Sequence, residues 1–513
     1  MDNIKLKTKI DFFSMAGVLV VAGIIVMVNI LANYAVIRID LTKNNIYSLS
    51  PASKRLLRKL DDRVLIKAYF TKNITPPYST YRDYLKDLLA EYKTYSRGMV
   101  NYTFVPDTDE DNFLQEARSY GIPSLRFQEI RRDKFEVKEG VMGLAVLFED
   151  NSEVIPVVRG VDSLEYDLTS RILKLTRDSR KTLGLITGFD ALDITERNQE
   201  INENLRQQYD VVKFTMEEDE EIPENIDALI LIGPQETISQ EALFAIDQSV
   251  MKGRPLFAAV NGFKADLERF NATELRTGLE ELLKSYGAGL KPGMVIDANA
   301  QNIAIRQQQG MFSIQNIVPY FFVPLVKDIS QDSPVIKDLE AISTPFVKAI
   351  DFDADKNKDI IFNPLARSSN QSWVRTIYNI SPYSRLSPGA QEELKSEVLI
   401  ATLEGSFKSH FAEKEIPEKF ANAEVLKESV KNRILVSGSG YMFNDSYPIM
   451  PSNMVFLLNA IDWVLQDEAL IGIRSKDIKF RPIGEVANWK RVVFKNVNLL
   501  LMPLLLILYG LFR

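Results

Sequence analysis

The stretch ALILIGPQETISQEALFAIDQSVMKGRPLFAAV, residues 228–260, contains a complete strand–helix–strand unit. Its two ends, Ala228–Ile232 and Pro255–Val260, are short apolar runs typical of strands that are buried on both faces. Between them, Ser239 precedes an amphipathic segment that stops before Gly253. We expect Ser239 to cap a helix and Gly253 to end it. This unit predicts an α/β fold with a parallel sheet.

The same alternation extends outward on both sides of this unit. Upstream, the sequence predicts a strand at Thr182–Thr187, a helix at Thr195–Gln208 and a strand at Asp210–Phe214. Downstream, Ser396–Leu403 and Arg433–Ser437 are interpreted as strands that return to the same sheet. Ligands of such sheets gather at the carboxyl ends of the strands. The candidate ligand residues therefore lie in the loops after three strands, at Gly188, Phe189, Asp190, Gly233, Asn261 and Gly262.

This part of the chain resembles the glutamine amidotransferase class I-like fold, whose enzymes place a nucleophilic cysteine in the turn after a central strand. Here Asn261-Gly262 occupies that turn, and the chain has no cysteine. Thiolate catalysis and cysteine-ligated metal sites are therefore excluded. The single histidine, His410, lies in a polar stretch and is interpreted as a surface or partly packed residue. We expect no enzymatic activity, no cofactor and no metal.

A smaller α/β block precedes the sheet. A helix is predicted at Tyr81–Arg97, with four strands around it at Val64–Phe70, Val100–Val105, Val141–Phe148 and Glu153–Val158. This order of elements resembles the thioredoxin fold. Where a redox enzyme of that fold carries Cys-x-x-Cys, this chain has Thr75-Pro76-Pro77-Tyr78. Redox exchange needs a thiolate, so we expect a scaffold for packing or binding.

Apolar segments at both ends predict membrane anchors. Residues 12–37 contain no charged residue, and about 20 apolar residues suffice to span a bilayer. Residues 492–513 form a shorter second candidate. Lysines 5, 7 and 9 precede the first segment, which favours a cytoplasmic N-terminus. We therefore expect both termini to be cytoplasmic and the large body to lie on the periplasmic side of the cytoplasmic (inner) membrane.

Two amides in the first segment are candidate contacts with a partner helix. Asn29 and Asn33 lie four residues apart, so a helix places them on one face. An amide that faces lipid is costly, and a hydrogen bond to another span would satisfy it. The alternative is that both residues lie near the interface and contact water.

These interpretations divide the chain into seven segments. They are a cytoplasmic N-terminus (1–11), a transmembrane helix (12–37), a juxtamembrane connector (38–62), a thioredoxin-like domain (63–160), a connecting helix (161–180), an amidotransferase-like domain with insertions (181–485) and a C-terminal transmembrane helix (492–513). Within the insertions, the glutamine-rich residues 301–315 are interpreted as a mobile loop.

Several motifs occur in a recognisable order along the chain. They include Tyr47-Ser48-Leu49-Ser50, Ile246-Asp247-Gln248, Leu403-Glu404-Gly405-Ser406-Phe407 and Asn459-Ala460-Ile461-Asp462-Trp463. With the two anchors, they resemble the gliding-motility-associated auxiliary component of ABC transporters, the Gld-type G protein of Bacteroidetes and its relatives. The resemblance implies a non-catalytic extracytoplasmic subunit beside an ABC permease and its cytoplasmic ATPase.

The partners expected from these features are the lipid bilayer, the permease with its ATPase, and an envelope ligand of unknown identity. The formal net charge of −7, with lysine and arginine scattered, argues against nucleic acid. Two other functions stay open at this point. One is a structural or adhesive envelope protein without an ATPase partner, and the other is an anchored hydrolase that uses His410 or an acidic pair at the sheet edge.

Overall fold

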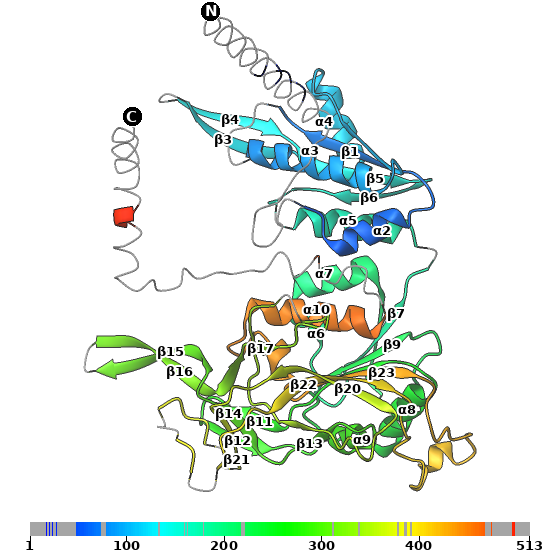
Figure 1. Ribbon diagram of the computed structural model, residues 1–513, viewed down its shortest axis with the longest axis vertical. Helices are drawn as coiled ribbons and strands as arrows, with labels where there is room; N and C mark the ends of the chain where they lie inside the picture. Colours follow the sequence, from blue (N-terminus) through cyan, green and yellow to red (C-terminus); the bar gives the residue numbers. More distant parts are fainter. Residues whose placement is uncertain are drawn as a thin grey trace, which may run out of the picture.

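A computed structural model gives the arrangement of the chain in space (Figure 1). It describes residues 48–466 with short gaps, together with 17, 20, 23, 27, 473 and 495–497; the gaps are 73–77, 132–133, 159, 162, 178, 217–220, 310–311, 337–338, 377–378, 384–386 and 390–391. Two α/β units lie one above the other in Figure 1. The structure therefore supports a mixed α/β fold.

The N-terminal unit contains a four-stranded sheet in the order β2-β1-β5-β6. β1 pairs in parallel with β2 and antiparallel with β5, and β5 forms an antiparallel hairpin with β6. Helices α3 and α5 cover the core, which contains residues of β1, β5 and both helices. The elements are α2 (Pro51–Arg58), β1 (Val64–Phe70), α3 (Tyr78–Tyr95), β2 (Val100–Phe104), α4 (Glu110–Ser119), β3 (Leu125–Arg131), β4 (Lys134–Gly140), β5 (Met142–Phe148), β6 (Asn151–Ile155) and α5 (Leu164–Leu175).

The second unit contains an eight-stranded sheet in the order β17-β20-β22-β23-β10-β9-β7-β8. The five strands from β23 to β8 run in parallel, while β22 pairs antiparallel with both β23 and β20. The sheet is therefore mixed, and the prediction of a parallel sheet was wrong for β22 and β17, which run opposite to the other six strands. The strands of this sheet are β7 (Thr182–Ile186), β8 (Asp210–Phe214), β9 (Ala228–Ile232), β10 (Leu256–Ala259), β17 (Asp328–Ile329), β20 (Ile360–Arg367), β22 (Val398–Gly405) and β23 (Asn432–Ser437).

Helices cover both faces of this sheet. One apolar core packs α6 (Ile194–Arg197), α7 (Gln199–Gln208) and α10 (Pro451–Val464) on one face. A second core packs α8 (Gln240–Met251) and α9 (Leu279–Ser285) on the other (Figure 1). The predicted single helix over 195–208 is two helices, because the Asn198 side chain caps α7. The predicted cap of α8 is confirmed, since the Ser239 hydroxyl accepts from the backbone N–H of Ala242 at 3.2 Å.

The second unit also contains strands that lie outside the eight-stranded sheet. The segment predicted as a mobile loop (301–315) falls in a long hairpin of β15 and β16, so that prediction was wrong for its described residues. The strands outside the eight-stranded sheet are β11 (Phe263–Asp266), β12 (Asn271–Glu274), β13 (Gly289–Leu290), β14 (Met294–Asp297), β15 (Ala300–Gln309), β16 (Phe312–Val326), β18 (Ile342–Ser343), β19 (Ile350–Asp351) and β21 (Ser372–Arg375), and two 3₁₀ turns cover Glu418–Phe420 and Tyr441–Phe443.

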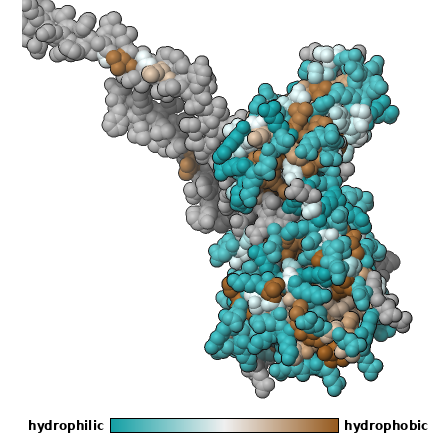
Figure 2. All heavy atoms as spheres, turned by 90° about the vertical axis from the view of Figure 1, so that its right-hand side faces the viewer, coloured by the Kyte–Doolittle hydropathy of each residue, from teal (hydrophilic) through white to brown (hydrophobic). Residues whose placement is uncertain are grey.

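The predicted anchors lie almost entirely outside the described residues, as do Asn29 and Asn33. Among the residues that are described, no helix has the length and apolar character needed to cross a membrane. The visible face of the body in Figure 2 is mostly hydrophilic, with small apolar areas scattered over both units.

Candidate functional site

The candidate ligand loops meet at the carboxyl edge of the eight-stranded sheet. The Asn261 side chain joins two of them, because its amide nitrogen donates to the carbonyl of Gly233 and its amide oxygen accepts from the N–H of Gly440, each at 3.1 Å. Asn261 is 4% exposed. The Asn261 amide therefore serves as an internal bridge between β9, β10 and the loop after β23.

The loop after β7 forms a tight turn and is bonded to the loop after β9. Phe189 and Asp190 have φ angles of 60° and 51°, and the N–H of Ala191 donates to the carbonyl of Gly188 at 3.1 Å. Two positive φ angles in sequence are those of a type I′ turn, which is unusual for residues other than glycine, asparagine and aspartate. The Gln235 side chain donates to Asp190 Oδ2 at 3.0 Å. The structure thus brings all six candidate residues into one cluster.

Close packing fills the space between these loops. A Cβ atom on Gly188 would overlap the carbonyl oxygen of Thr215, and one on Gly440 would overlap the backbone of Gly233. A Cβ atom on Gly262 would overlap the side chain of Lys348. These glycines allow backbone segments to approach one another, which accounts for them without a phosphate or other ligand between the loops.

Charged and aromatic side chains also pack at the carboxyl edge of the eight-stranded sheet. Lys348, whose side chain is 7% exposed, forms an ion pair with Glu274 at 2.9 Å and lies 5.2 Å from the ring centroid of Phe263. The Tyr441 hydroxyl donates to the carbonyl of Phe263 at 2.8 Å. Burial raises the pKa of Tyr441, so its phenol stays neutral and keeps this bond. The polar groups described at this edge therefore form hydrogen bonds and ion pairs with other parts of the protein.

A buried polar centre lies beside α8, on the face of the eight-stranded sheet that α8 and α9 cover. Asp247 is fully buried, and its carboxylate accepts four hydrogen bonds. The donors are the hydroxyls of Tyr286 and Ser409, the backbone N–H of His410 and the side-chain amide of Gln248, at 2.9, 2.6, 2.9 and 3.0 Å. Burial, followed by the Asp247 charge, raises the pKa of Tyr286 well above its usual value. This centre ties α8 and α9 to the chain after β22.

His410 belongs to this centre and is only 7% exposed, so of the two predicted placements, surface or partly packed, the surface one was wrong. Its Nε2 lies 2.7 Å from Lys414 Nζ, and its Nδ1 lies 2.7 Å from the Ser285 hydroxyl. An ammonium group has donors only, so Nε2 must accept and Nδ1–H must donate to Ser285. The Ser285 hydroxyl in turn donates to the carbonyl of Glu281 at 3.1 Å.

This direction of hydrogen bonds is the reverse of what a serine hydrolase needs. A catalytic histidine accepts the proton of the serine hydroxyl, whereas His410 donates to it. Burial, then the nearby Lys414 charge, lowers the pKa of His410, which favours the neutral ring. The arrangement is consistent with a structural role. No group of three or more acidic or histidine side chains in the described chain could hold a metal ion.

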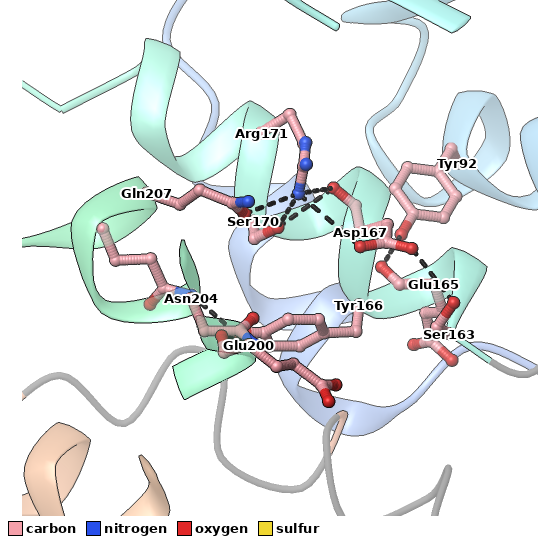
Figure 3. A network of polar contacts seen from close by, with 11 residues as sticks. Tyr92, Ser163, Glu165, Tyr166, Asp167, Ser170, Arg171, Glu200, Asn204 and Gln207 are labelled. Atoms are coloured by element: carbon pink, nitrogen blue, oxygen red, sulfur yellow. Dashed lines mark hydrogen bonds and ion pairs between the residues drawn. The ribbon is translucent and has the colours of Figure 1, made fainter. Parts of the chain in front are cut away.

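A polar joint connects the two units (Figure 3). Arg171 on α5 donates to the side-chain oxygen of Gln207 on α7 at 2.9 Å and forms an ion pair with Asp167 at 3.6 Å. Beside them, the amide of Gln208 donates to the Tyr166 hydroxyl at 2.6 Å. Polar contacts between domains are typical of interfaces that permit relative motion. We therefore interpret the joint of α5 and α7 as a hinge contact.

Two more contacts lie near this joint, and the second of them joins the two units. The Lys181 ammonium donates to the carbonyl of Leu465, just past α10. Ile473, 2% exposed, packs in an apolar cluster with Ala52 of α2 and Tyr166 of α5. The chain after α10 therefore touches the N-terminal unit, which no sequence motif indicated.

Replacing Arg171 with alanine is expected to widen the distribution of distances between the units without unfolding either one. The loss of a partly exposed ion pair should change the free energy of unfolding by no more than about 1 kcal/mol. Because the chain has no cysteine, nitroxide labels can be attached to cysteines introduced at the exposed positions Lys93 and Glu241. Double electron–electron resonance would measure the distribution, and an unchanged width would contradict the hinge.

Comparisons with known proteins place the chain in a family. Residues 180–462 match the family described as an ABC-type uncharacterized transport system, and residues 43–147 match a domain family of unknown function. An uncharacterized protein of Borreliella burgdorferi is 24% identical over 492 residues, which cover 93% of each chain. The solved mmIFT52 N-terminal domain aligns 97% of its length with 55% of this chain, at 12% identity and a TM-score of 0.31. The first match covers more than half of the chain, which therefore belongs to the auxiliary family of ABC-type transport systems.

Proposed function

We propose that this protein is a non-catalytic auxiliary subunit of an ABC transporter, anchored at both ends with its body outside the cytoplasm. In this proposal it contacts a permease and couples to the cytoplasmic ATPase through that permease. The family supports the association with transport. The apolar segments at 12–37 and 492–513 support the anchoring. The order of the sequence motifs supports a relationship to the gliding-motility components.

The covered carboxyl edge of the sheet carries the non-catalytic part of the proposal. An enzyme of this architecture would act at that edge, yet Asn261 bridges the loops there and Lys348 lies against Gly262. We infer that the second unit is an amidotransferase-like scaffold and the first a thioredoxin-like scaffold, both used for binding. The polar joint between them provides a place where binding at one unit could alter the other.

Purification of the full chain from detergent-solubilised membranes tests the proposal. We expect a permease and an ATPase to co-purify with it. Replacing Asn29 and Asn33 with leucine should weaken this association by about 1–2 kcal/mol, because interhelical hydrogen bonds would be lost. A body that purifies alone under all mild detergents would favour a structural envelope protein. Hydrolysis of an envelope substrate that disappears in His410→Ala would favour an enzyme.

Topology has its own test. A cysteine introduced at the exposed residue Glu241 should react with a membrane-impermeant thiol reagent once the outer membrane is permeabilised. The cysteine-free parent chain is the control for labelling of other sites. Reaction only after lysis of the inner membrane would place the body in the cytoplasm and overturn this part of the proposal.

A further inference from the structure

A cavity of about 360 Å³ lies at the base of the hairpin of β15 and β16, a hairpin that Figure 1 shows. This volume falls within the range of small-molecule sites, about 300–1,000 Å³. Every lining residue has a polar or charged side chain. The lining residues are Asn299 before β15, Lys327 and Asp328 after β16, and Ser368, Ser369 and Asn370 in the loop after β20.

The cavity lies at the carboxyl edge of the eight-stranded sheet. β20 and β23 both pair antiparallel with β22, so β20 runs in the same direction as β23 and β10. Residues 368–370 follow the end of β20, and Asp328 starts β17, which runs the opposite way. Ligands of α/β sheets gather at the carboxyl ends of the strands. The loops after β9 and β10 are packed against each other at this edge, whereas the cavity lies beside β20.

A buried carboxylate holds part of the cavity wall in place. Asp297, 1% exposed, accepts from the backbone N–H and the hydroxyl of Ser369 at 2.7 and 2.5 Å. It also accepts from the backbone N–H of Asn299 at 2.8 Å. The side-chain nitrogen of Asn299 donates to the carbonyl of Leu325 at 2.7 Å. Because precise binding needs lining groups that are fixed by supporting contacts, this wall is suited to hold a ligand.

Lys327 and Asp328 bring charges of opposite sign to the cavity, and both residues are exposed. In the part of the chain that the structure describes, neither side chain forms an ion pair or a hydrogen bond, with the other or with any third residue. The Asn370 side chain has no partner among the described residues either. The cavity therefore offers a cation, an anion and an amide to a ligand.

We propose that this cavity binds a free polar amino acid, with its carboxylate on Lys327 and its ammonium group on Asp328. A zwitterion forms charge-assisted hydrogen bonds at both residues, whereas a ligand of one charge would use only one of them. The lining has no aliphatic residue to receive an apolar side chain and no aromatic ring on which a sugar could stack. The amide of Asn370 can bond a polar side chain. This inference rests on the cavity and does not depend on the transporter role.

Saturation-transfer NMR on the full, detergent-solubilised chain tests the proposal with a mixture of the common amino acids at millimolar concentration. We expect at least one polar amino acid to bind. Its N-acetyl and carboxamide derivatives each lack one charge and should bind about tenfold more weakly, the loss of one hydrogen bond to a charged group. Binding by no amino acid, or equal binding by the blocked derivatives, would overturn the proposal. Binding by inorganic phosphate alone would do the same and indicate an adventitious ion only.

Two variants assign each charge of the ligand to its residue. Lys327→Gln should weaken binding of the amino acid about tenfold but leave its carboxamide derivative unaffected, since that contact is already absent. Asp328→Asn should show the corresponding pattern with the N-acetyl derivative. Lys358→Gln, at an exposed lysine before the start of β20, is the matched control and should bind like the parent chain. Equal losses for free and blocked ligands in both variants, or a loss in the control, would overturn the assignment to this cavity.

Discussion

Replacing Asp247 with alanine is expected to lower the free energy of unfolding by several kcal/mol, because each buried donor left without its acceptor costs about 1–3 kcal/mol. The carboxylate accepts from Tyr286, Ser409, Gln248 and the backbone of His410 in a fully buried site. Its loss would leave several buried donors without a partner. Chemical denaturation of the detergent-solubilised chain, followed by tryptophan fluorescence, would measure the change.

Glu241→Ala is the matched control for this prediction. Glu241 is an acidic residue on the same helix, α8, but it is exposed. Surface substitutions of this kind change the free energy of unfolding by about 0.5 kcal/mol or less. Equal effects of the two variants would mean that the buried network does not stabilise the unit.

Replacing Asn261 with alanine is expected to cost about 1–3 kcal/mol of stability, because one buried backbone group, the carbonyl of Gly233, loses its partner. The N–H of Gly440 would lose its bond to Asn261 but keep the one to the carbonyl of Val260, at 3.1 Å. Asn225, exposed in a turn, provides the control variant. Thermal denaturation of both variants would separate a structural bridge from a ligand contact. A fully stable Asn261→Ala chain that loses association with its transporter would assign Asn261 to binding.

The sequence predicted the sheet best where strands are short and apolar. The predicted bounds of β9 agree with the structure, because a continuous apolar run bounded by turn residues has few alternative placements. The predicted bounds of β8 agree as well, although its sequence DVVKF contains two charged residues. The reversal of β22 was missed, since periodicity reports burial and carries no information on strand direction. The convergence of Gly188, Gly233 and Asn261 followed from the topology, whereas the packing that fills the space between them depends on tertiary contacts.

Three features of the structure were missed or wrongly predicted from the sequence. Leu243, Asp247 and Val250 have the spacing of one helical face, so a carboxylate within that apolar stripe could have indicated a buried polar centre. Ile303 and Ile305 alternate with other residues as in a strand, but the glutamine content favoured a loop. His410 was misplaced because its partners, Ser285 and Asp247, come from other parts of the chain.

The apolar cluster of Ala52, Tyr166 and Ile473 has a mechanical consequence. Ala52 stands near the start of the described chain and Ile473 beyond the last helix of the body, yet both belong to this one cluster. A force that pulls the two ends of the protein apart therefore acts first on this cluster. The hydrogen bonds of the eight-stranded sheet carry no tension until the cluster separates. The protein can thus transmit force between its ends through α2 and α5 while both units keep their shape.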